Sequence, residues 1–214
     1  MNRVCEPEIL DSLPFDHPDA VHNRRDLRLI NLFMGNGTWF ERVLPPLIRP
    51  GERALELGAG VGELGLRLNR CGLSLDGLDL WPRPALWPRG CEWLAEDLKT
   101  FSGYDTYAVV IGNLIFHQLT DAELAVLGAK LRRRARIIIA CEPSRRRMSQ
   151  RMMATFAPLF GANHVTLHDA HVSIAAGFIG DELPLALGMD PGAWNYSCRM
   201  TALGAFRMVA VRNP

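Results

Sequence analysis

The chain has 214 residues, with 24 lysines and arginines against 23 aspartates and glutamates, so its formal net charge is +1. This balance argues against a dedicated nucleic-acid binder, which would carry a large basic excess, and against polybasic attachment to acidic membranes. Hydrophobic residues make up 48% and charged residues 22%, as in a globular protein and unlike a disordered chain.

The cysteines and the N-terminal residues indicate a compartment. The five cysteines form no C-x-x-C pair and their number is odd, which disfavours a disulfide framework or a zinc ribbon and favours a reducing environment. The first residues, MNRVCEPEIL, lack the apolar run of a signal peptide, and no apolar stretch approaches the roughly 18 residues of a membrane span. We therefore expect a cytoplasmic protein.

Residues 1–50 carry signals for helices and none for strands. Leu27, Ile30 and Met34 recur at i, i+3 and i+7, which predicts one helix before Gly35. A second, short helix is expected at 39–44, ended by two prolines. We interpret residues 1–50 as a helical cap on a domain that spans 51–214.

From residue 51 onward, strand and helix patterns alternate. Strands are expected at 53–57, 73–80, 92–94, 107–112, 136–141, 194–201 and 205–212, and helices at 63–70, 121–131 and 149–160. This alternation predicts an α/β fold with a doubly wound, mostly parallel sheet and helices on both faces. The last two strands are close enough in sequence to form an antiparallel hairpin.

A glycine-rich loop follows the first expected strand. In ALELGAGVG the strand runs directly into Gly58, Gly60 and Gly62, and a helix follows. Glycines permit a tight turn and let a ligand approach the backbone closely. Gly60, Gly62 and Gly65 also fit G-x-G-x-x-G, the dinucleotide fingerprint, so a nicotinamide-dependent oxidoreductase is one alternative.

Glu56 helps to separate the two kinds of ligand. It lies two residues before Gly58, where its carboxylate would repel the pyrophosphate of a dinucleotide. The ammonium and sulfonium groups of S-adenosylmethionine would instead be attracted. The alternative for Glu56 is an ion pair with an arginine at the strand edge.

Two further carboxylates follow the next strands. Asp79 ends the second strand at the same edge as the glycine loop, where it can accept hydrogen bonds from both hydroxyls of a ribose. Asp76 lies lower in the strand or faces the other way, so Asp79 is preferred. Asp97 follows the third strand and can accept from an adenine amino group while Leu98 covers the ring; the alternative is a helix cap.

These segments resemble the successive motifs of class I S-adenosylmethionine-dependent methyltransferases. The matching segments are ALELGAGVG, GLDL, AEDL and YAVVIGNLIFHQL, in the same order and spacing over about residues 50–142. The resemblance implies a seven-stranded sheet with its last strand antiparallel. It also implies that Glu56, Gly58 and Gly60 lie along the methionine part of the cofactor, with Asp79 and the adjoining Leu80 at the ribose, Asp97 and Leu98 at the adenine, and Asn113 beside the transferred methyl group.

A looser resemblance links NRRDLRLINLFMGNGTWF and HDAHVSIAAGFIGDEL to small bacterial methyltransferases associated with polyketide or phenolic-lipid biosynthesis. It implies a small-molecule acceptor, such as the hydroxyl of an aromatic or polyketide-derived compound. By the same analogy Arg24, Asn36 or Trp39 closes over the cofactor. Because they flank the strand–helix core, residues 1–50 and 164–190 are expected to close over the ligand, with 164–190 as a candidate substrate lid. A protein that binds S-adenosylmethionine without catalysis is a further alternative.

Two histidines are candidate general bases for a hydroxyl acceptor. His117 follows Asn113 at the end of the fourth strand, and His168 has Asp169 beside it to orient the imidazole. His117 has a structural alternative, in which Asp121 satisfies it at a helix start, and His168 or His171 could lie in a substrate lid. The sequence Asn113-Leu-Ile-Phe departs from the N-P-P-aromatic pattern of nucleic-acid amine methylation, so nucleic acid is not expected as a partner.

Two other groups of residues have more than one interpretation. His164, His168 and His171 would share a face of a helix and could bind zinc, but the β-branched residues between them favour an extended segment, so no metal is expected. The methionines of the helix expected at 149–160, and Met148 before it, indicate either core packing or an apolar acceptor pocket.

Overall fold

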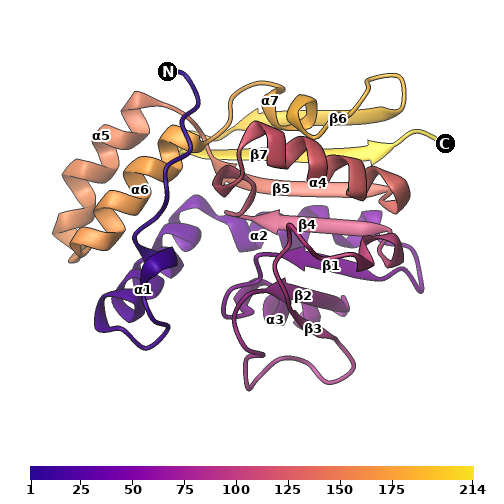
Figure 1. Cartoon of the computed structure of the whole chain (residues 1–214), viewed down its shortest axis with the longest axis horizontal. Helices are drawn as coiled ribbons and strands as arrows, with labels where there is room; N and C mark the ends of the chain where they lie inside the picture. Colours follow the sequence, from indigo (N-terminus) through magenta and orange to yellow (C-terminus); the bar gives the residue numbers. More distant parts are fainter.

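The computed structural model describes residues 1–214, which form one central sheet with helices around it (Figure 1). The strands are β1 (Ala54–Leu57), β2 (Leu75–Asp79), β3 (Trp93–Ala95), β4 (Val109–Asn113), β5 (Ile137–Pro143), β6 (Trp194–Met200) and β7 (Ala205–Arg212). The α-helices are α1 (Pro18–Met34), α2 (Asn36–Val43), α3 (Glu63–Arg70), α4 (Asp121–Arg134), α5 (Arg147–Phe156), α6 (His164–Ala176) and α7 (Glu182–Ala186). Short 3-10 turns lie at Leu10–Ser12, Pro45–Leu47, Gly103–Thr106, Phe116–Gln118 and Ala157–Phe160.

The seven strands lie in the order β3-β2-β1-β4-β5-β7-β6. The first five pair in parallel, and β7 pairs antiparallel with both β5 and β6. This confirms the expected seven-stranded, doubly wound sheet with its last strand antiparallel. The order reverses between β1 and β4, which is the switch point at which open α/β sheets bind ligands, beyond the carboxyl ends of the strands.

Each face of the sheet carries its own hydrophobic core, because successive side chains of a strand point to opposite faces. Ile138 and Ala140 of β5 belong to the larger core, which α4 helps to cover, whereas Ile137, Ile139 and Cys141 belong to the core beneath α2 and α3. All seven residues of β5 are buried, as a strand covered on both faces requires.

The expected helix boundaries are largely those of the structure. Gly35 ends α1 in the left-handed conformation, with φ of 66°, and α2 begins at the next residue. Thr120 caps α4 in a capping box with Glu123. No helix combines the length and the apolar character needed to cross a bilayer.

The expectation of an extended segment at His164–His168 is wrong, because these residues begin α6. The side chain of Asn163 accepts a hydrogen bond from the backbone N–H of Thr166 and so caps the helix. Val165, Asp169, Val172 and Ala176 are buried along one side. A cap and a buried face outweigh the few tenths of a kcal/mol that β-branched residues lose in a helix.

Residues 1–13 form a segment that the sequence did not distinguish from the rest of the cap. In Figure 1 this chain runs from the N-terminus past α6 to α1, across the end of the sheet. Its contacts reach distant parts of the chain: Arg3 donates hydrogen bonds to the carbonyls of Leu119 (2.6 Å) and Ala176 (2.8 Å). We call residues 1–13 the N-terminal segment.

Candidate functional site

A cavity of about 820 Å³ lies beyond the carboxyl ends of the parallel strands. Its lining includes the ends of β1, β2 and β4, the N-terminal segment, and residues of α1, α5 and α6. In Figure 1 these three helices stand together on the side of the sheet to which β1 and β4 point. The cavity therefore occupies the position that the strand order predicts for a ligand.

The glycine loop forms one wall of the cavity. Gly58 and Gly60 both line it, with φ values of 59° and 58° that disfavour other residues. A side chain at Gly58 would collide with Ile115, whereas one at Gly60 would project into space with no atom within 4 Å. Gly60 thus leaves room for a ligand against its backbone. Gly65, the third glycine of the dinucleotide pattern, does not line the cavity and packs against Trp87.

Glu56 lines the cavity from within β1, and its side chain is nearly inaccessible to solvent. Its Oε2 is buried and has no hydrogen-bond partner. Burial, and then the nearby charge of Asp79, raise the pKa of Glu56 to about 8. The backbone N–H of Gly65 opposes this rise in pKa only in part. The expected alternative, an ion pair with an arginine, does not occur, so this carboxyl is available to a donor or a cation in the cavity.

Asp79 connects the end of β2 to the glycine loop. Its Oδ2 accepts from the backbone N–H of Gly60 (2.7 Å) and its Oδ1 from that of Trp81 (2.9 Å). Burial raises its pKa in spite of these hydrogen bonds. Each oxygen keeps a lone pair for a further donor, and the residue lines the cavity.

Asp76 is placed elsewhere, as its position in the strand predicted. It does not line the cavity. Its oxygens bind Arg53, the backbone N–H of Glu92 (2.7 Å) and the hydroxyl of Tyr107 (2.9 Å). Asp76 is thus committed to the fold, and Asp79 is the carboxylate of β2 that a ligand can reach.

Asp97, Leu98 and Leu80 lie at the next part of the rim. All three line the cavity, and the side chain of Leu80 is largely exposed. Asp97 accepts through Oδ1 from the backbone N–H of Lys99 (2.8 Å), which is a local turn contact, and no side-chain hydrogen bond engages Oδ2.

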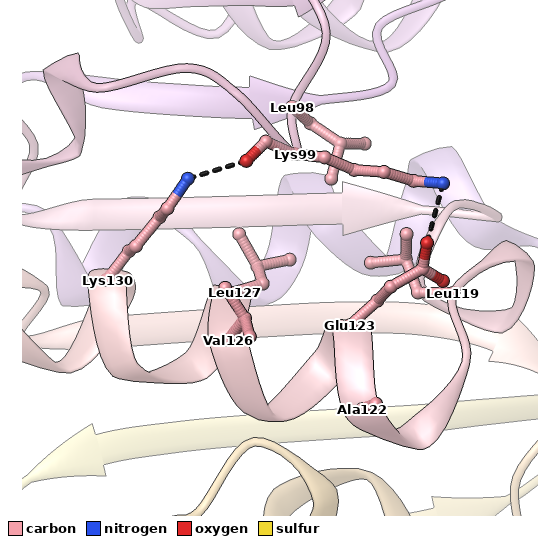
Figure 2. Close-up of a pocket in the computed structure, with 8 residues that line it drawn as sticks. All are labelled: Leu98, Lys99, Leu119, Ala122, Glu123, Val126, Leu127 and Lys130. Atoms are coloured by element: carbon pink, nitrogen blue, oxygen red, sulfur yellow. Dashed lines mark hydrogen bonds and ion pairs between the residues drawn. The ribbon is translucent and has the colours of Figure 1, made fainter.

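A second, smaller cleft of about 210 Å³ adjoins the cavity (Figure 2). Leu98, Lys99 and Leu119 line both spaces and so form the partition between them. On the cleft side, the ammonium of Lys99 binds Glu123 of α4, and Lys130 donates to the carbonyl of Lys99. These contacts fix the backbone that presents Leu98 to the cavity.

Three side-chain amides connect α1 and α2 to the end of β4. Asn36 donates to the oxygens of both Asn113 (2.9 Å) and Asn31 (2.8 Å), and Asn113 donates to Asn31 (3.0 Å). Asn113 and Asn31 line the cavity, whereas Asn36 and Trp39, two residues expected to close over it, do not. Arg24, the third, lines the cavity and stacks on Phe15.

His117 lies in the cavity wall between two carboxylates. Its Nδ1 is 2.6 Å from Glu142 Oε2, and its Nε2 is 3.2 Å from Glu8 Oε1. Burial favours the neutral ring, but hydrogen bonds to Glu142 and Glu8 and their charges outweigh burial and raise the pKa of His117 to about 9. The ring therefore carries both protons at neutral pH. Both ring nitrogens are thus occupied by Glu142 and Glu8, so His117 neither pairs with Asp121, as the structural alternative expected, nor is free to act as a base on a substrate.

His168 has the predicted orienting neighbour but lies outside the cavity. Its Nδ1 is 3.0 Å from Asp169 Oδ1, and its side chain is 44% exposed on α6. It is absent from the cavity wall, to which Asp169 and Ser173 of the same helix contribute. Although His164, His168 and His171 do share this helix, the structure contains no group of three or more side chains suited to a metal ion.

The far half of the cavity is apolar and is formed by α1 and α5. Met152, Met153 and Phe156 of α5 face it, and none of the residues of α5 is buried. Across from them are Leu27, Ile30 and Met34 of α1. Core packing of these methionines is therefore excluded: Met152 and Met153 line an apolar part of the cavity, whereas Met148 is exposed and does not line it.

Neither a protein-family model nor a curated protein matches the sequence. Solved structures match the fold. The plantazolicin methyltransferase BpumL, in complex with a monoazolic desmethylPZN analog and SAH, gives a TM-score of 0.72 at 11% identity, covering 95% of this chain and 92% of that chain.

The chain shares the fold of this methyltransferase. Magnesium protoporphyrin IX methyltransferase (ChlM) from Synechocystis PCC 6803, with bound SAH, gives 0.53 at 15% identity and covers 86% of this chain and 83% of its own. A structure from echinomycin biosynthesis, described by the conversion of a disulfide bond into a thioacetal group, gives 0.57 at 19% identity, with 83% and 81% covered.

Several site residues carried no signal that sequence reasoning used. Glu142 ends a strand of apolar residues, and Glu8 lies among residues with no periodic pattern. Asn31 falls within a helix, where an amide is usually solvated. Only their contacts across the fold, with His117 and with Asn113, identify them as parts of the site.

Proposed function

We propose that the protein transfers a methyl group from S-adenosylmethionine to a small molecule. The observation that carries this proposal is the buried, unpartnered carboxyl of Glu56 beside the open backbone of Gly60. A buried carboxyl with a free oxygen is unfavourable unless a ligand pairs with it. The ammonium of S-adenosylmethionine would supply that partner, and two methyltransferase structures that share the fold contain SAH.

The cavity offers a partner for each part of the cofactor. Glu56, Gly58 and Gly60 would hold the methionine part, and Asp79 the ribose hydroxyls next to Leu80. Asp97 would accept from the adenine amino group while Leu98, supported from behind as Figure 2 shows, covers the ring. Asn113, held by two other amides, would lie beside the reacting methyl group.

The apolar half supports a neutral acceptor such as an aromatic or polyketide-derived hydroxyl compound. The residues of α5 that line the cavity are uncharged, because Arg147 and Arg151 do not line it, and the facing stripe of α1 (Leu27, Ile30 and Met34) is apolar, although Arg24, Asp26 and Arg28 of the same helix also line the cavity. Apolar surface left facing a cavity is stabilised when an apolar ligand removes it from water, at about 25 cal/mol per Å². An anionic or strongly polar acceptor would gain nothing from these apolar stripes.

The sulfonium supplies an electrophilic methyl group with a good leaving group, so the chain must chiefly align the acceptor with it. Alignment of two bound reactants can lower a barrier by several kcal/mol. The amides around Asn113 fix one side of the reacting centre, and the apolar stripes orient the acceptor on the other. The N-terminal segment and α6 limit access of water.

Calorimetry with SAH, followed by a methyl-transfer assay on a panel of phenols with product mass measured, tests the proposal. SAH should bind the wild type and the Asp105→Asn control, whose exposed side chain is remote from the cavity, and should bind Glu56→Gln more weakly. Equal binding of NAD would restore the oxidoreductase alternative. Binding of SAH without turnover of any acceptor would instead indicate a non-catalytic binding protein.

A further inference from the structure

Glu8 of the N-terminal segment reaches into the cavity and meets side chains from two other parts of the chain. His117 Nε2 lies 3.2 Å from its Oε1, which also accepts from the hydroxyl of Ser173 of α6. Gln118 approaches Oε2 at 3.4 Å. All four residues line the cavity, and the side chain of Glu8 is only 11% exposed. Oε2 is the oxygen of Glu8 with room for a stronger donor.

The N-terminal segment is fastened on both sides of Glu8. Before it, Arg3 binds the carbonyls of Leu119 and Ala176. After it, the backbone N–H groups of Ile9 and Leu10 donate to the two oxygens of Asp169, at 2.8 and 3.1 Å. The carboxylate of Glu8 is thus placed by backbone and side-chain contacts and does not depend on a flexible tail.

His117 is itself fixed from behind by Glu142. This buried carboxylate accepts from the backbone N–H groups of Ile115 and Phe116, both at 3.0 Å, as well as from the imidazole. His117 therefore donates an N–H to Glu8 and has no free lone pair with which to take a proton from the methyl acceptor. Burial opposes ionisation of Glu8, but the hydrogen bond and charge of His117 outweigh burial and lower its pKa.

We propose that Glu8 is the catalytic carboxylate that faces the acceptor hydroxyl and takes its proton, and that His117 and Glu142 are positioning residues that hold it. This inference rests on the proposed function. The acceptor oxygen forms a bond to the methyl carbon, the carbon–sulfur bond breaks with its electron pair left on sulfur, and the hydroxyl proton passes to Glu8. From there the proton leaves to solvent when product is released.

Other carboxylates surround this point and compete for the same role. Asp11 lines the cavity from the N-terminal segment, and partial burial, followed by the charges of Glu8 and Asp169, raises its pKa to about 6. Asp169 has both oxygens engaged by backbone N–H groups and so offers less to a ligand. A test must therefore separate Glu8 from Asp11.

The probe is 4-nitrophenol, whose ionised form absorbs visible light, bound to the protein in saturating SAH. A carboxylate next to the phenol oxygen stabilises the neutral phenol, so the ionisation midpoint of the bound probe should rise by about one pH unit. The rise should persist in Glu6→Gln, an exposed carboxylate of the same segment, and in Asp11→Asn. It should be lost in Glu8→Gln and reduced in Glu8→Asp, which keeps the charge but withdraws it by one methylene group.

SAH affinity, measured on each variant, reports whether the cofactor site is intact. A wild type that fails to bind SAH contradicts the proposed function. If SAH binds but the probe does not, or if its midpoint is the same in the wild type and both Glu8 variants, this inference alone is overturned. If the rise in the ionisation midpoint is lost in Asp11→Asn but kept in Glu8→Gln, Asp11 is the carboxylate next to the phenol. That result would also overturn the inference about Glu8.

Discussion

The two halves of the cavity are built by different means. The polar half consists of loops that follow β1, β2 and β4, and its side chains are fixed by hydrogen bonds such as those from Gly60 and Trp81 to Asp79. The apolar half consists of the apolar side chains that α1, α5 and the turn after α5 turn to the cavity, and these side chains have no directional partners and contact other apolar groups, as Phe33 does with Phe160 at 5.9 Å between ring centroids. The comparison indicates that the polar half is rigid and suits one fixed ligand, the cofactor, whereas the apolar half can adapt to acceptors of different shape.

Removing a fixed carboxylate should have the largest effect, confined to the polar half. Asp79→Ala leaves ribose hydroxyls unpaired at a cost of about 1–3 kcal/mol, which is roughly a five- to 150-fold loss of SAH affinity. Calorimetry measures this, with Asp105→Asn as the control. Unchanged affinity would show that another carboxylate binds the ribose.

The charge of Glu56 should make cofactor binding depend on pH. With a pKa of about 8, the free carboxyl is mostly protonated at pH 6, and an ammonium ligand requires it ionised. Affinity for SAH should therefore rise from pH 6 to 8, by up to about tenfold per unit, and level off above pH 8. Proton release in buffers of different ionisation enthalpy checks the same linkage, and Glu56→Gln should remove it. A flat profile in the wild type would mean that Glu56 stays neutral in the complex.

Truncation in the apolar half should change acceptor use and spare the cofactor. Phe156→Ala removes an aromatic side chain that lines the apolar half of the cavity. The value of kcat/KM for an aromatic acceptor should therefore fall by roughly tenfold, or about 1.4 kcal/mol. SAH affinity should stay within twofold, by the same free-energy reasoning. Leu159→Ala, an exposed residue outside the cavity, is the matched control. Equal loss in both variants would indicate a general effect on stability.

The smallest expected effect is a change in the mobility of the segments around the cavity when ligands bind. The segments 1–50 and 164–190 flank the cavity, so ligand binding should reduce their opening and slow amide exchange by about two- to fivefold. Hydrogen exchange with SAH and then with SAH and a phenol separates the two halves: the apolar half should respond mainly to the second ligand. Exchange that ignores both ligands would show that these segments are not a lid.

The polar half could be predicted from sequence because its residues follow a local rule. Strand, glycine and carboxylate lie within a few residues of each other, and the carboxyl ends of parallel strands meet at one edge, which places Glu56, Gly60 and Asp79 together without knowledge of the rest. The antiparallel β7 was expected because the last two strands are close in sequence and because the resemblance implies it, whereas the strand order itself was not predicted. These are short-range patterns repeated along the chain.

The remainder depends on contacts between distant segments. Glu8 and His117 are separated by more than a hundred residues, and nothing in either neighbourhood predicts the pair. The helical start of α6 was missed because β-branched propensity was weighed without the cap from Asn163. The methionines of α5 fit either a core or a pocket by sequence, and only the exposure of this helix excludes the core.

Leu114, the residue after Asn113, introduces backbone strain into the loop that follows β4. Its φ of 60° makes it the one residue other than glycine with positive φ, a conformation that costs a leucine about 1–2 kcal/mol. The loop nevertheless stays in place because the N–H of Leu114 donates to the carbonyl of Cys141 (2.8 Å) and those of Ile115 and Phe116 donate to Glu142. Hydrogen bonds to β5 therefore keep the strained loop after β4 in place. A substitution in β5 that weakens these hydrogen bonds would let the loop relax and would displace Asn113, although Asn113 itself is unchanged.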